Sequence, residues 1–422
     1  MSEARSTEAL RVVHVTHTVS AASACYRLHR ALAASGAVRS TVAALHTTLR
    51  DPEVRVARAS GVDALRGLAS TAAERALRIA WRLDRRYDFD PGRAERFDWR
   101  AIERLAPDVL HLHWIGGGVL SAERLGALPW PTVLTLHDSW AVTGGCHVPE
   151  QAGCARFEHG CGACPMLARA HDDDLTARTW RAKRRAWEGR PFELIAPSRW
   201  MADRASASPL LRDHAVHVVA HGIDLDTWRP VDRAAARAAF NLAPDDTVIL
   251  TGAWNPFRDR NKGFDLACAA VRALGRGRAN SPTLLVFGDD ATPSTDLRVR
   301  TLGAIRDPSR LRALYAAADV TVVASRAESF SLVALESLAC GTPVAAFDAT
   351  GLRTVLAHRD GGWLAQPWST DDLADGIAWL LAPANVTAQR EAARTRAVEH
   401  FSAAASAAAH ARVYASLTRG SR

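Results

Sequence analysis

Residues 322–346 read VVASRAESFSLVALESLACGTPVAA, and this pattern predicts the fold of the chain. The apolar run that ends at Ala324 has the composition of a buried strand. After a polar turn, aliphatic side chains recur at helical spacing as far as Leu338, and Gly341 and Pro343 end that helix. The apolar residues that follow predict the next strand. Strand, helix and strand in this order form a βαβ unit, which indicates a parallel α/β sheet.

Two glutamates in this βαβ unit could bind a ligand. Glu328 lies in the strand-to-helix turn, where it can point at hydroxyl groups, and Glu336 lies on the helix, where it can accept hydrogen bonds from a ribose. Backbone N–H groups near Ser331 and Leu332 have no partners within the helix and favour an anion. The alternative is an ordinary turn with two solvated glutamates, and this segment by itself does not exclude it.

The composition is that of a globular protein with more than one domain. The chain has 422 residues, which is too long for one ordinary core, and 48% of them are hydrophobic. No apolar run approaches the ~20 residues of a membrane span, and the first residues lack the apolar core of a signal peptide. We therefore expect a cytoplasmic protein. The net charge of +8 is compatible with nucleic acid, anionic lipid or phosphorylated small molecules as partners.

The first half alternates between predicted strands and helices. A strand over 10–16 precedes a helix over 24–34, and two later strands each end in a histidine at the carboxyl edge, where α/β sheets bind ligands. The strands that we predict here cover residues 10–16, 40–45, 109–114, 132–138, 193–198 and 217–224.

The second half begins a new alternation with a strand over 247–252. Further strands are predicted over 283–288 and 301–303, and alanine-rich helices over 371–381 and 389–417 end the chain. We expect an α/β protein of two Rossmann-like domains that face each other across a cleft. Their predicted bounds are 1–227 and 228–397, with a C-terminal helix at about 398–422 that packs back on the first domain.

Residues 62–86 form an amphipathic basic segment with leucine and alanine on one side and arginine on the other. A surface helix that covers the sheet explains this pattern, and we favour it. Peripheral contact with an anionic membrane, at its inner face, is the functional alternative.

A second polar cluster follows the strand over 247–252. It contains Gly252, which permits close backbone approach, and then Arg258, Lys262 and Gly263. Arginine and lysine at this position can neutralise a diphosphate. A solvated basic loop is the alternative for this cluster taken alone.

Together these motifs resemble one known family. The second half is similar to the donor-binding domain of the GT-B retaining glycosyltransferases of family GT4, whose E-x7-E motif matches Glu328 and Glu336. The family's Lys-Gly pair matches Lys262 and Gly263. Further matches are the base-holding segment, here 302–305, and the approach to the linker, here 196–198 and 221–224.

The resemblance implies a set of site residues. Glu328 would contact hydroxyl groups of the donor sugar, and His137 matches the family's active-site histidine from the first domain, although a capping or core histidine is the alternative. Arg258 and Lys262 would bind the diphosphate and Glu336 the ribose. The implied donor-binding residues are Arg258, Lys262, Ile305, Ser331, Leu332 and Glu336.

The resemblance also implies the reaction. A hexosyltransferase (EC 2.4) of this family moves a sugar, with retention, from a nucleotide diphosphate sugar to a glycan, lipid-linked or small-molecule acceptor. The leaving phosphate would accept the acceptor's proton in a front-side attack. Because no Asp-x-Asp motif stands at an expected metal position, and Asp224 to Asp226 lies in the expected linker, catalysis without a metal or other cofactor is expected. One departure from the family is residues 19–23, VSAAS, where a glycine-rich turn is usual.

Four of the seven cysteines lie close together in the sequence. Their stretch resembles an insertion in the subgroup of these transferases that builds exopolysaccharides such as colanic acid. Four thiolates suit a structural zinc ion, with free thiols or disulfides as the alternatives and His147 and His159 as spare ligands. The candidate zinc ligands are Cys146, Cys154, Cys161 and Cys164.

Three other functions explain fewer of the sequence features. A GT-B sugar-nucleotide epimerase shares the fold, and a phosphorylase would need a pyridoxal-phosphate lysine or a phosphate site that the sequence does not show. A basic, zinc-containing nucleic-acid-binding protein would explain the arginines around Trp180 and Trp187. It leaves the E-x7-E motif unexplained, and we expect no nucleic acid partner.

Overall fold

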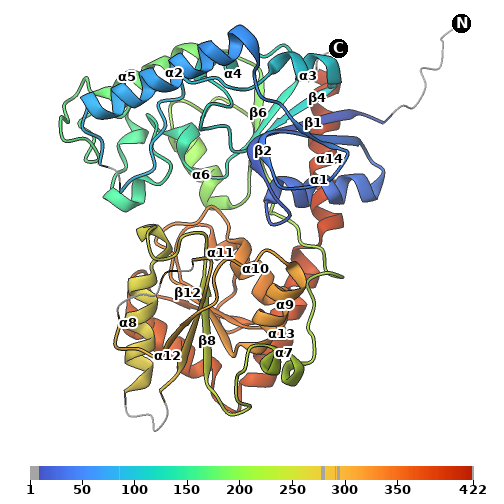
Figure 1. Ribbon diagram of the computed structural model, residues 1–422, viewed down its shortest axis with the longest axis vertical. Coiled ribbons are helices and arrows are strands. Elements are labelled where there is room, and N and C mark those ends of the chain that lie inside the picture. The colour runs from blue at the N-terminus through green and yellow to red at the C-terminus, as the bar shows by residue number, and fades with distance from the viewer. Residues whose placement is uncertain (1–8, 85, 277–280, 290, 292–294, 421–422) are drawn as a thin grey trace, which may run out of the picture. The chain divides into compact units, whose positions relative to one another are not determined.

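The computed structural model describes residues 9–84, 86–276, 281–289, 291 and 295–420. The chain forms two compact units, each built on its own parallel sheet (Figure 1). The first unit contains residues 1–197, 201–219 and 404–422, and the second contains 198–200 and 220–403.

The first unit has a seven-stranded sheet in which the described pairs are all parallel. The order is β3-β2-β1-β4-β5-β6-β7, so the chain changes direction across the sheet between β1 and β4. That reversal is a topological switch point, where the strand ends leave a crevice for ligands. The strands are β1 (Arg11–Val19), β2 (Arg39–Thr47), β3 (Val54–Val56), β4 (Val109–Leu112), β5 (Thr132–Thr135), β6 (Phe192–Ala196) and β7 (Val216–Val218).

The helices of this unit begin at polar capping residues. The Ser23, Asp98, Ser121 and Asp174 side chains each accept a hydrogen bond from a backbone N–H in the first turn of their helix. The described helices are α1 (Ala24–Ser35), α2 (Gly61–Ala80), α3 (Trp99–Leu105), α4 (Ala122–Gly126), α5 (Leu175–Trp187), α6 (Arg199–Ala207) and α14 (Ala403–Gly420).

The second unit has a six-stranded parallel sheet with the order β10-β9-β8-β11-β12-β13, and its switch point lies between β8 and β11. The strands are β8 (Val248–Gly252), β9 (Thr283–Phe287), β10 (Val299–Thr301), β11 (Val320–Val323), β12 (Val344–Phe347) and β13 (Gly362–Ala365). The described helices are α7 (Arg233–Ala239), α8 (Phe264–Gly275), α9 (Pro308–Ala317), α10 (Leu332–Ala339), α11 (Leu352–Val355), α12 (Thr370–Leu380) and α13 (Val386–His400).

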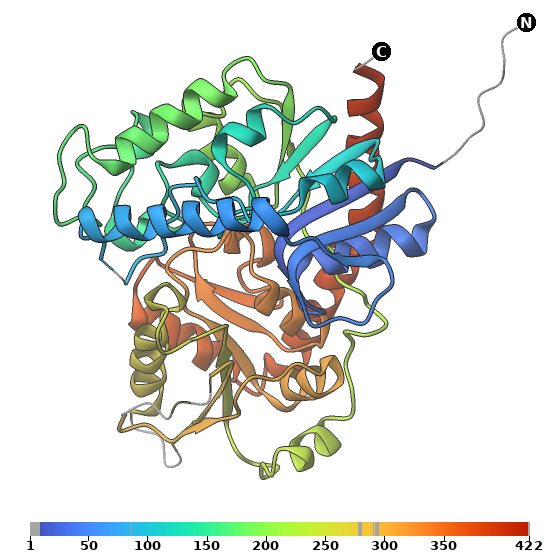
Figure 2. The ribbon, with the colours of Figure 1, turned by 45° about the horizontal axis from the view of Figure 1, so that its top comes forward.

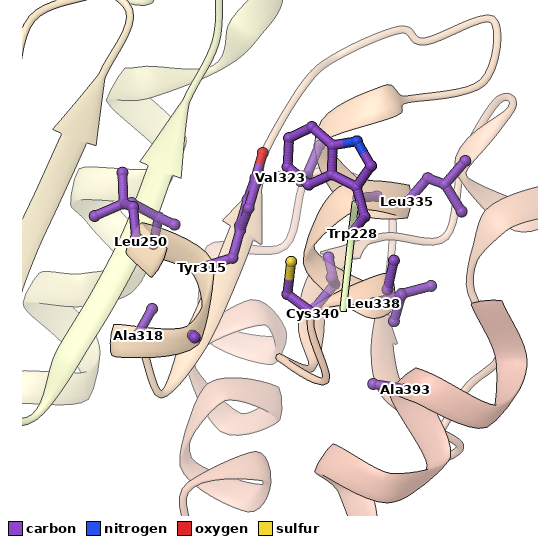
Figure 3. Close-up of a cluster of buried hydrophobic side chains, with 14 of the residues drawn as sticks. Trp228, Leu250, Tyr315, Ala318, Val323, Leu335, Leu338, Cys340 and Ala393 are labelled. Atoms are coloured by element: carbon purple, nitrogen blue, oxygen red, sulfur yellow. The ribbon is translucent and has the colours of Figure 1, made fainter. Parts of the chain in front are cut away.

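The βαβ unit predicted from residues 322–346 is confirmed. β11 leads into α10, and β12 returns beside β11 in parallel, with Thr321 paired to Val344. One face of this unit forms the core of the second unit, where Tyr315 and Trp228 lie edge to face at 6.1 Å and pack with Leu338 and Cys340 (Figure 3). The apolar spacing of α10 exists because this face is buried.

The single helix predicted over 389–417 is wrong. The helix α13 ends at His400, Phe401 leaves helical geometry, and α14 begins at Ala403. Phe401 is buried, and its carbonyl accepts a hydrogen bond from the N–H of Ile223, whose own carbonyl accepts from Ala403. This short parallel bridge removes backbone groups from the helical ladder, and alanine content alone does not reveal it.

The helix α2 does not cover the sheet with its apolar side as we favoured. The side chains of Val62, Leu65, Leu68 and Ile79 are 63% to 67% exposed, and Gly67 is the only buried residue of the helix. The helix lies on the outside of the first unit (Figure 2) and approaches the chain through Gly67, since a Cβ there would lie 2.6 Å from the carbonyl oxygen of Glu95. The side chains of Leu65 and Leu68 are therefore exposed, whereas Leu77 packs against the buried cluster that contains Phe89.

The loop that follows β5 is held by a buried acid–base pair. Asp138 Oδ2 accepts hydrogen bonds from Trp114 Nε1 and pairs with His147 Nδ1, each at 2.8 Å. Burial disfavours the charged form of His147, yet its pKa is raised overall, because the carboxylates of Asp138, Asp90 and Asp88 surround it. The same pair lowers the pKa of Asp138 in spite of its burial. His147 thus stabilises the ionised carboxylate of Asp138.

This pair predicts how stability depends on pH. Because the pKa of His147 in the folded chain exceeds its ordinary value of 6.5, the stabilisation is fully present below pH 6.5 and is lost as pH rises through the folded pKa. We expect the difference in melting temperature between the wild type and His147→Gln to be larger at pH 6 than at pH 8.5. A difference that does not change with pH would contradict the charged pair.

Candidate active site

Two turns meet at the switch point of the second unit, at the carboxyl ends of β8 and β11. Lys262 Nζ from the first turn donates to Glu328 Oε1 of the second at 3.0 Å, and Ser325 Oγ donates to the same oxygen at 2.9 Å. Both charged side chains are mostly buried, and the carboxylate of Glu328 raises the pKa of Lys262. The sequence motifs predicted both residues, and the structure shows that they form one ion pair.

Asn261 positions this ion pair and was missed by sequence reasoning. Its buried amide donates to the carbonyl of Ala327 at 2.7 Å and accepts from the N–H of the same residue at 2.9 Å. Its carbonyl also accepts from the N–H of Arg326. These bonds hold the turn that carries Glu328 against the residue next to Lys262. Its place beside the Lys-Gly pair was the only signal in the sequence.

Gly263 is required by a close backbone approach. Its φ is +65°, and a Cβ there would lie 1.9 Å from the carbonyl oxygen of Ala324. No side chain fits at that distance, so the second residue of the Lys-Gly pair lets the two turns touch.

The start of α10 is a strained backbone position. Ser331 has φ +98° and ψ +98°, which is costly for a residue with a Cβ. Its hydroxyl accepts from Ala334 N–H at 3.3 Å and so caps the helix. The turn places backbone N–H groups of the α10 N-terminus close to the Glu328 turn, as an anion site would need.

Glu336 is more enclosed than expected for a surface ligand. It is 4% exposed, and its Oε2 accepts from the Tyr315 hydroxyl at 2.8 Å. Its role at a ribose stays a prediction. Of the remaining predicted donor residues, Arg258 is exposed in its loop, while Ile305 and Leu332 are partly buried against the core of the unit.

In the first unit, three histidines form a hydrogen-bonded chain across the switch point. His137, just after β5, contacts His113 through its Nε2 at 3.0 Å, and His113 contacts His14 Nδ1 at 3.0 Å. Burial lowers the pKa of His137 to about 4 and holds the pKa values of His113 and His14 well below 6.5. All three rings are therefore neutral at physiological pH.

Because these three hydrogen-bonded rings are neutral, the tautomer of one ring determines the tautomers of its neighbours. A neutral ring has one N–H and one acceptor nitrogen, so His113 must donate one of its two bonds and accept the other. The Nε2 of His14 is buried and has no hydrogen-bond partner among the described residues. An orphaned N–H is rarer than an orphaned acceptor, which favours the proton of His14 on Nδ1. In that arrangement His137 accepts through Nε2 and carries its own proton on Nδ1.

Within the described residues, only His14, His111 and His113 bring three potential metal ligands within 4.8 Å of one another. The His111 nitrogens already contact the Tyr414 hydroxyl and Thr135 Oγ1, both at 2.7 Å. We therefore interpret these rings as a hydrogen-bonded network that joins α14 to β4 and β5. In the same unit, the Ser23 hydroxyl of the glycine-free loop donates to Ser20 and caps α1.

The four clustered cysteines are free thiols, and they lie near enough to influence one another electrostatically. No three of these sulfurs lie within 4.8 Å of one another. Burial raises the pKa of Cys161 to about 12 and that of Cys164 to about 11. The thiols of Cys161 and Cys164 are thus protonated in this arrangement.

Comparison with known proteins supports one family. The model described as Glycosyltransferase Family 4 matches residues 21–227, and the model described as Glycosyl transferases group 1 matches residues 245–383. D-inositol 3-phosphate glycosyltransferase 2 of Catenulispora acidiphila is 32% identical over 337 residues, which are 73% of this chain and 70% of that protein. The enzyme of Segniliparus rotundus is 34% identical over 180 residues, 40% of this chain and only 39% of that protein.

Solved structures show the same fold. Sucrose-phosphate synthase from Thermosynechococcus elongatus has a TM-score of 0.68 at 20% identity, over 97% of this chain and 100% of that one. HepE from Anabaena, in complex with UDP and glucose, has a TM-score of 0.64 at 16% identity, over 96% of this chain and 100% of that one. With both halves matched by family models and one relative aligned over more than two-thirds of its length, the chain belongs to glycosyltransferase family 4 and is a glycosyltransferase (EC 2.4) with the two-domain GT-B fold.

Proposed function

We propose that this enzyme moves a hexose, with retention, from a nucleotide diphosphate sugar to a glycan, lipid-linked or small-molecule acceptor. The observation that carries the proposal is the Lys262–Glu328 ion pair at the switch point between β8 and β11. A basic side chain and a strained helix start lie at the two turns that would meet a diphosphate. The complexes of HepE with UDP and with UDP-glucose make UDP-glucose the first donor to test.

Each group has a role that its chemistry supports. Cleavage of the sugar–phosphate bond leaves negative charge on the nucleoside diphosphate, which Lys262, Arg258 and the amides at Ser331 and Leu332 would stabilise. Glu328 would accept hydrogen bonds from the donor sugar. The ammonium group of Lys262 would then be shared between the carboxylate and the phosphate, and no cofactor is required for this step.

His137 is the proposed contribution of the first unit. Because burial keeps its ring neutral, it would act as a hydrogen-bond partner of the sugar and would not supply a positive charge. Its bond to His113 fixes the ring orientation, so a sugar hydroxyl would meet a defined nitrogen. We also propose that Glu336 binds the ribose and that Ile305 contacts the base.

Within the family, we propose an exopolysaccharide-type transferase. The cysteine-rich loop over 146–164 supports this placement, since it resembles the insertion of that subgroup. The relatives found by comparison bear another name, D-inositol 3-phosphate glycosyltransferase, and do not themselves support it.

The donor site is tested by separating binding from transfer. Glu328→Gln should keep UDP affinity within a few-fold and lose most UDP release from UDP-glucose, because an amide cannot replace the acceptor charge. Lys262→Met should weaken UDP binding by roughly tenfold or more, the effect of one charge-assisted hydrogen bond. Calorimetry with UDP, GDP, ADP and dTDP measures the first property, and a UDP-release assay measures the second.

Arg272→Met is the matched control for Lys262→Met. It removes an exposed cation of α8, Arg272, which pairs with Asp296. Unchanged nucleotide affinity in Lys262→Met, or full transfer by Glu328→Gln, would refute the assigned roles. Melting temperatures of all variants exclude global unfolding, since the unpaired partner of a buried ion pair is destabilising.

We propose peripheral contact with an anionic membrane through α2. Among the described residues, no helix combines the length and apolar character needed to cross a bilayer. The exposed apolar stripe of α2 is flanked by arginines, including Arg66 and Arg75, and this pattern is typical of helices that lie at a lipid interface. Such contact would bring the enzyme to lipid-linked acceptors.

Vesicle flotation tests this contact. The wild type should float with phosphatidylglycerol vesicles and not with phosphatidylcholine vesicles. The double variant Leu65→Ser/Leu68→Ser should bind roughly tenfold more weakly, because it removes two large apolar side chains from the interface. The control Val218→Ser/Val398→Ser changes exposed apolar side chains on other elements. Equal flotation of both variants would refute the role of α2.

We also propose that Cys146, Cys154, Cys161 and Cys164 hold a structural zinc ion. Their electrostatic proximity and the burial of Cys146 and Cys164 support the proposal, and binding would draw the four sulfurs together and release their protons. Metal analysis of reduced protein, purified with no chelator, should find about one zinc per chain. The double variant Cys161→Ser/Cys164→Ser should lose the ion, whereas Cys268→Ser should retain it. Absence of zinc from the wild type would end this proposal.

A further inference from the structure

The first unit contains a cavity of about 1010 Å³ beside α2 that the donor chemistry does not use. Its lining comes from the inner side of α2, from the segment around residues 88–96, and from the loop after β4. Trp114 and His147 line this cavity and also the small cavity that contains His137. The two cavities therefore share part of their walls, and His137 lines only the small one.

The cavity carries an excess of positive charge. Arg75 and Arg78 line it from α2 and Arg82 from the turn that follows the helix, and within the described chain none of these guanidinium groups pairs with a carboxylate. Arg75 and Arg78 lie at positions i and i+3 of the helix, a spacing that makes their side chains neighbours on its surface. A fourth arginine, Arg96, donates to the carbonyl of Gly117 at 2.6 Å, while its buried Nε has no partner among the described residues.

Three carboxylates line the cavity with the four arginines, and two of them accept hydrogen bonds from the backbone of its walls. Glu74 Oε1 accepts from the backbone N–H groups of Arg93 and Ala94, at 2.6 and 2.7 Å. Asp90 accepts from the N–H groups of Gly92 and Gly117, at 2.7 and 2.6 Å. Both carboxylates thus accept hydrogen bonds from the backbone of the cavity walls. With Asp88 the lining has three carboxylates against four guanidinium groups, so positive charge exceeds negative charge by one.

Trp114 supplies a fixed aromatic surface at the junction of the two cavities. Its ring is 37% exposed, its Nε1 donates to Asp138, and His147 stacks on it with 5.4 Å between ring centroids. Ile79, Leu83 and Phe89 add apolar lining farther from His137. An aromatic face suits the apolar face of a sugar ring, and arginine forks suit phosphate.

We propose that this cavity is the acceptor site and that the acceptor carries a phosphoryl or diphosphoryl group. The acceptor sugar lies on Trp114 near His137, and its phosphate is bound by Arg75, Arg78 and Arg82. This inference rests on the proposed glycosyltransferase activity and deepens it by naming the acceptor class. The phosphate belongs either to a soluble sugar phosphate or to a lipid diphosphate, and both present the same oxygens to the arginines.

Calorimetry on the full chain, with the donor site saturated by UDP, tests the site with two probes. Inorganic pyrophosphate represents the soluble source and farnesyl diphosphate the lipid source, with farnesol as the uncharged comparison. The variant Arg75→Gln/Arg78→Gln/Arg82→Gln should bind both diphosphates at least tenfold more weakly than the wild type. Tighter binding of farnesyl diphosphate than of pyrophosphate identifies a lipid-linked acceptor, and equal binding identifies a soluble one.

A matched variant separates the site from net charge. Arg55→Gln/Arg185→Gln/Arg190→Gln removes the same three charges from exposed positions outside the cavity and should bind both probes like the wild type. An equal loss in both triple variants, no binding to the wild type, or unchanged binding by the α2 variant would overturn the proposal. UDP binding and melting temperature of each variant are measured in parallel. If the wild type binds no nucleotide, the donor proposal fails. If it binds UDP, the binding of the two diphosphates decides the acceptor proposal separately.

Discussion

The ion pair between Lys262 and Glu328 joins two neighbouring strand ends of the second unit, and the candidate donor site is arranged around it. Both groups are mostly buried, and each charge would be costly to bury without the other. The Ser325 hydroxyl donates a hydrogen bond to the same carboxylate oxygen. Asn261 fixes the backbone of one turn and Gly263 lets the turns approach. A diphosphate that binds here meets a lysine that is already charged and positioned, which lowers the cost of reorganisation.

The first unit handles its polar groups in the opposite way. Its histidines are buried beside one another, and desolvation keeps them neutral, so they interact through directed hydrogen bonds and carry no charge. His137 lies at one end of this chain, and the pair of Asp138 and His147 lies immediately beside it. The first unit also carries charged groups, among them the Asp138–His147 pair and the exposed arginines Arg75 and Arg78 of α2.

The helix α2 shows how one element can serve two surfaces. Gly67 is its point of closest approach to the rest of the unit, so most of its circumference stays open. The apolar stripe with Leu65 and Leu68 faces outward, and the arginines of the last turns face the large cavity. A lipid-linked phosphate acceptor would satisfy both surfaces at once, which connects the membrane proposal to the acceptor proposal.

The sequence by itself determined the alternation of strands and helices, the βαβ unit over 322–346 and the family motifs that contain Lys262 and Glu328. These features are local, because periodicity and turn chemistry act within a few residues. Only the tertiary structure decided the contact of His14 with His113, the outward direction of the α2 stripe and the break at Phe401. The physical reason is that periodicity specifies which face of an element is apolar, whereas strand order and distant backbone hydrogen bonds decide what that face meets.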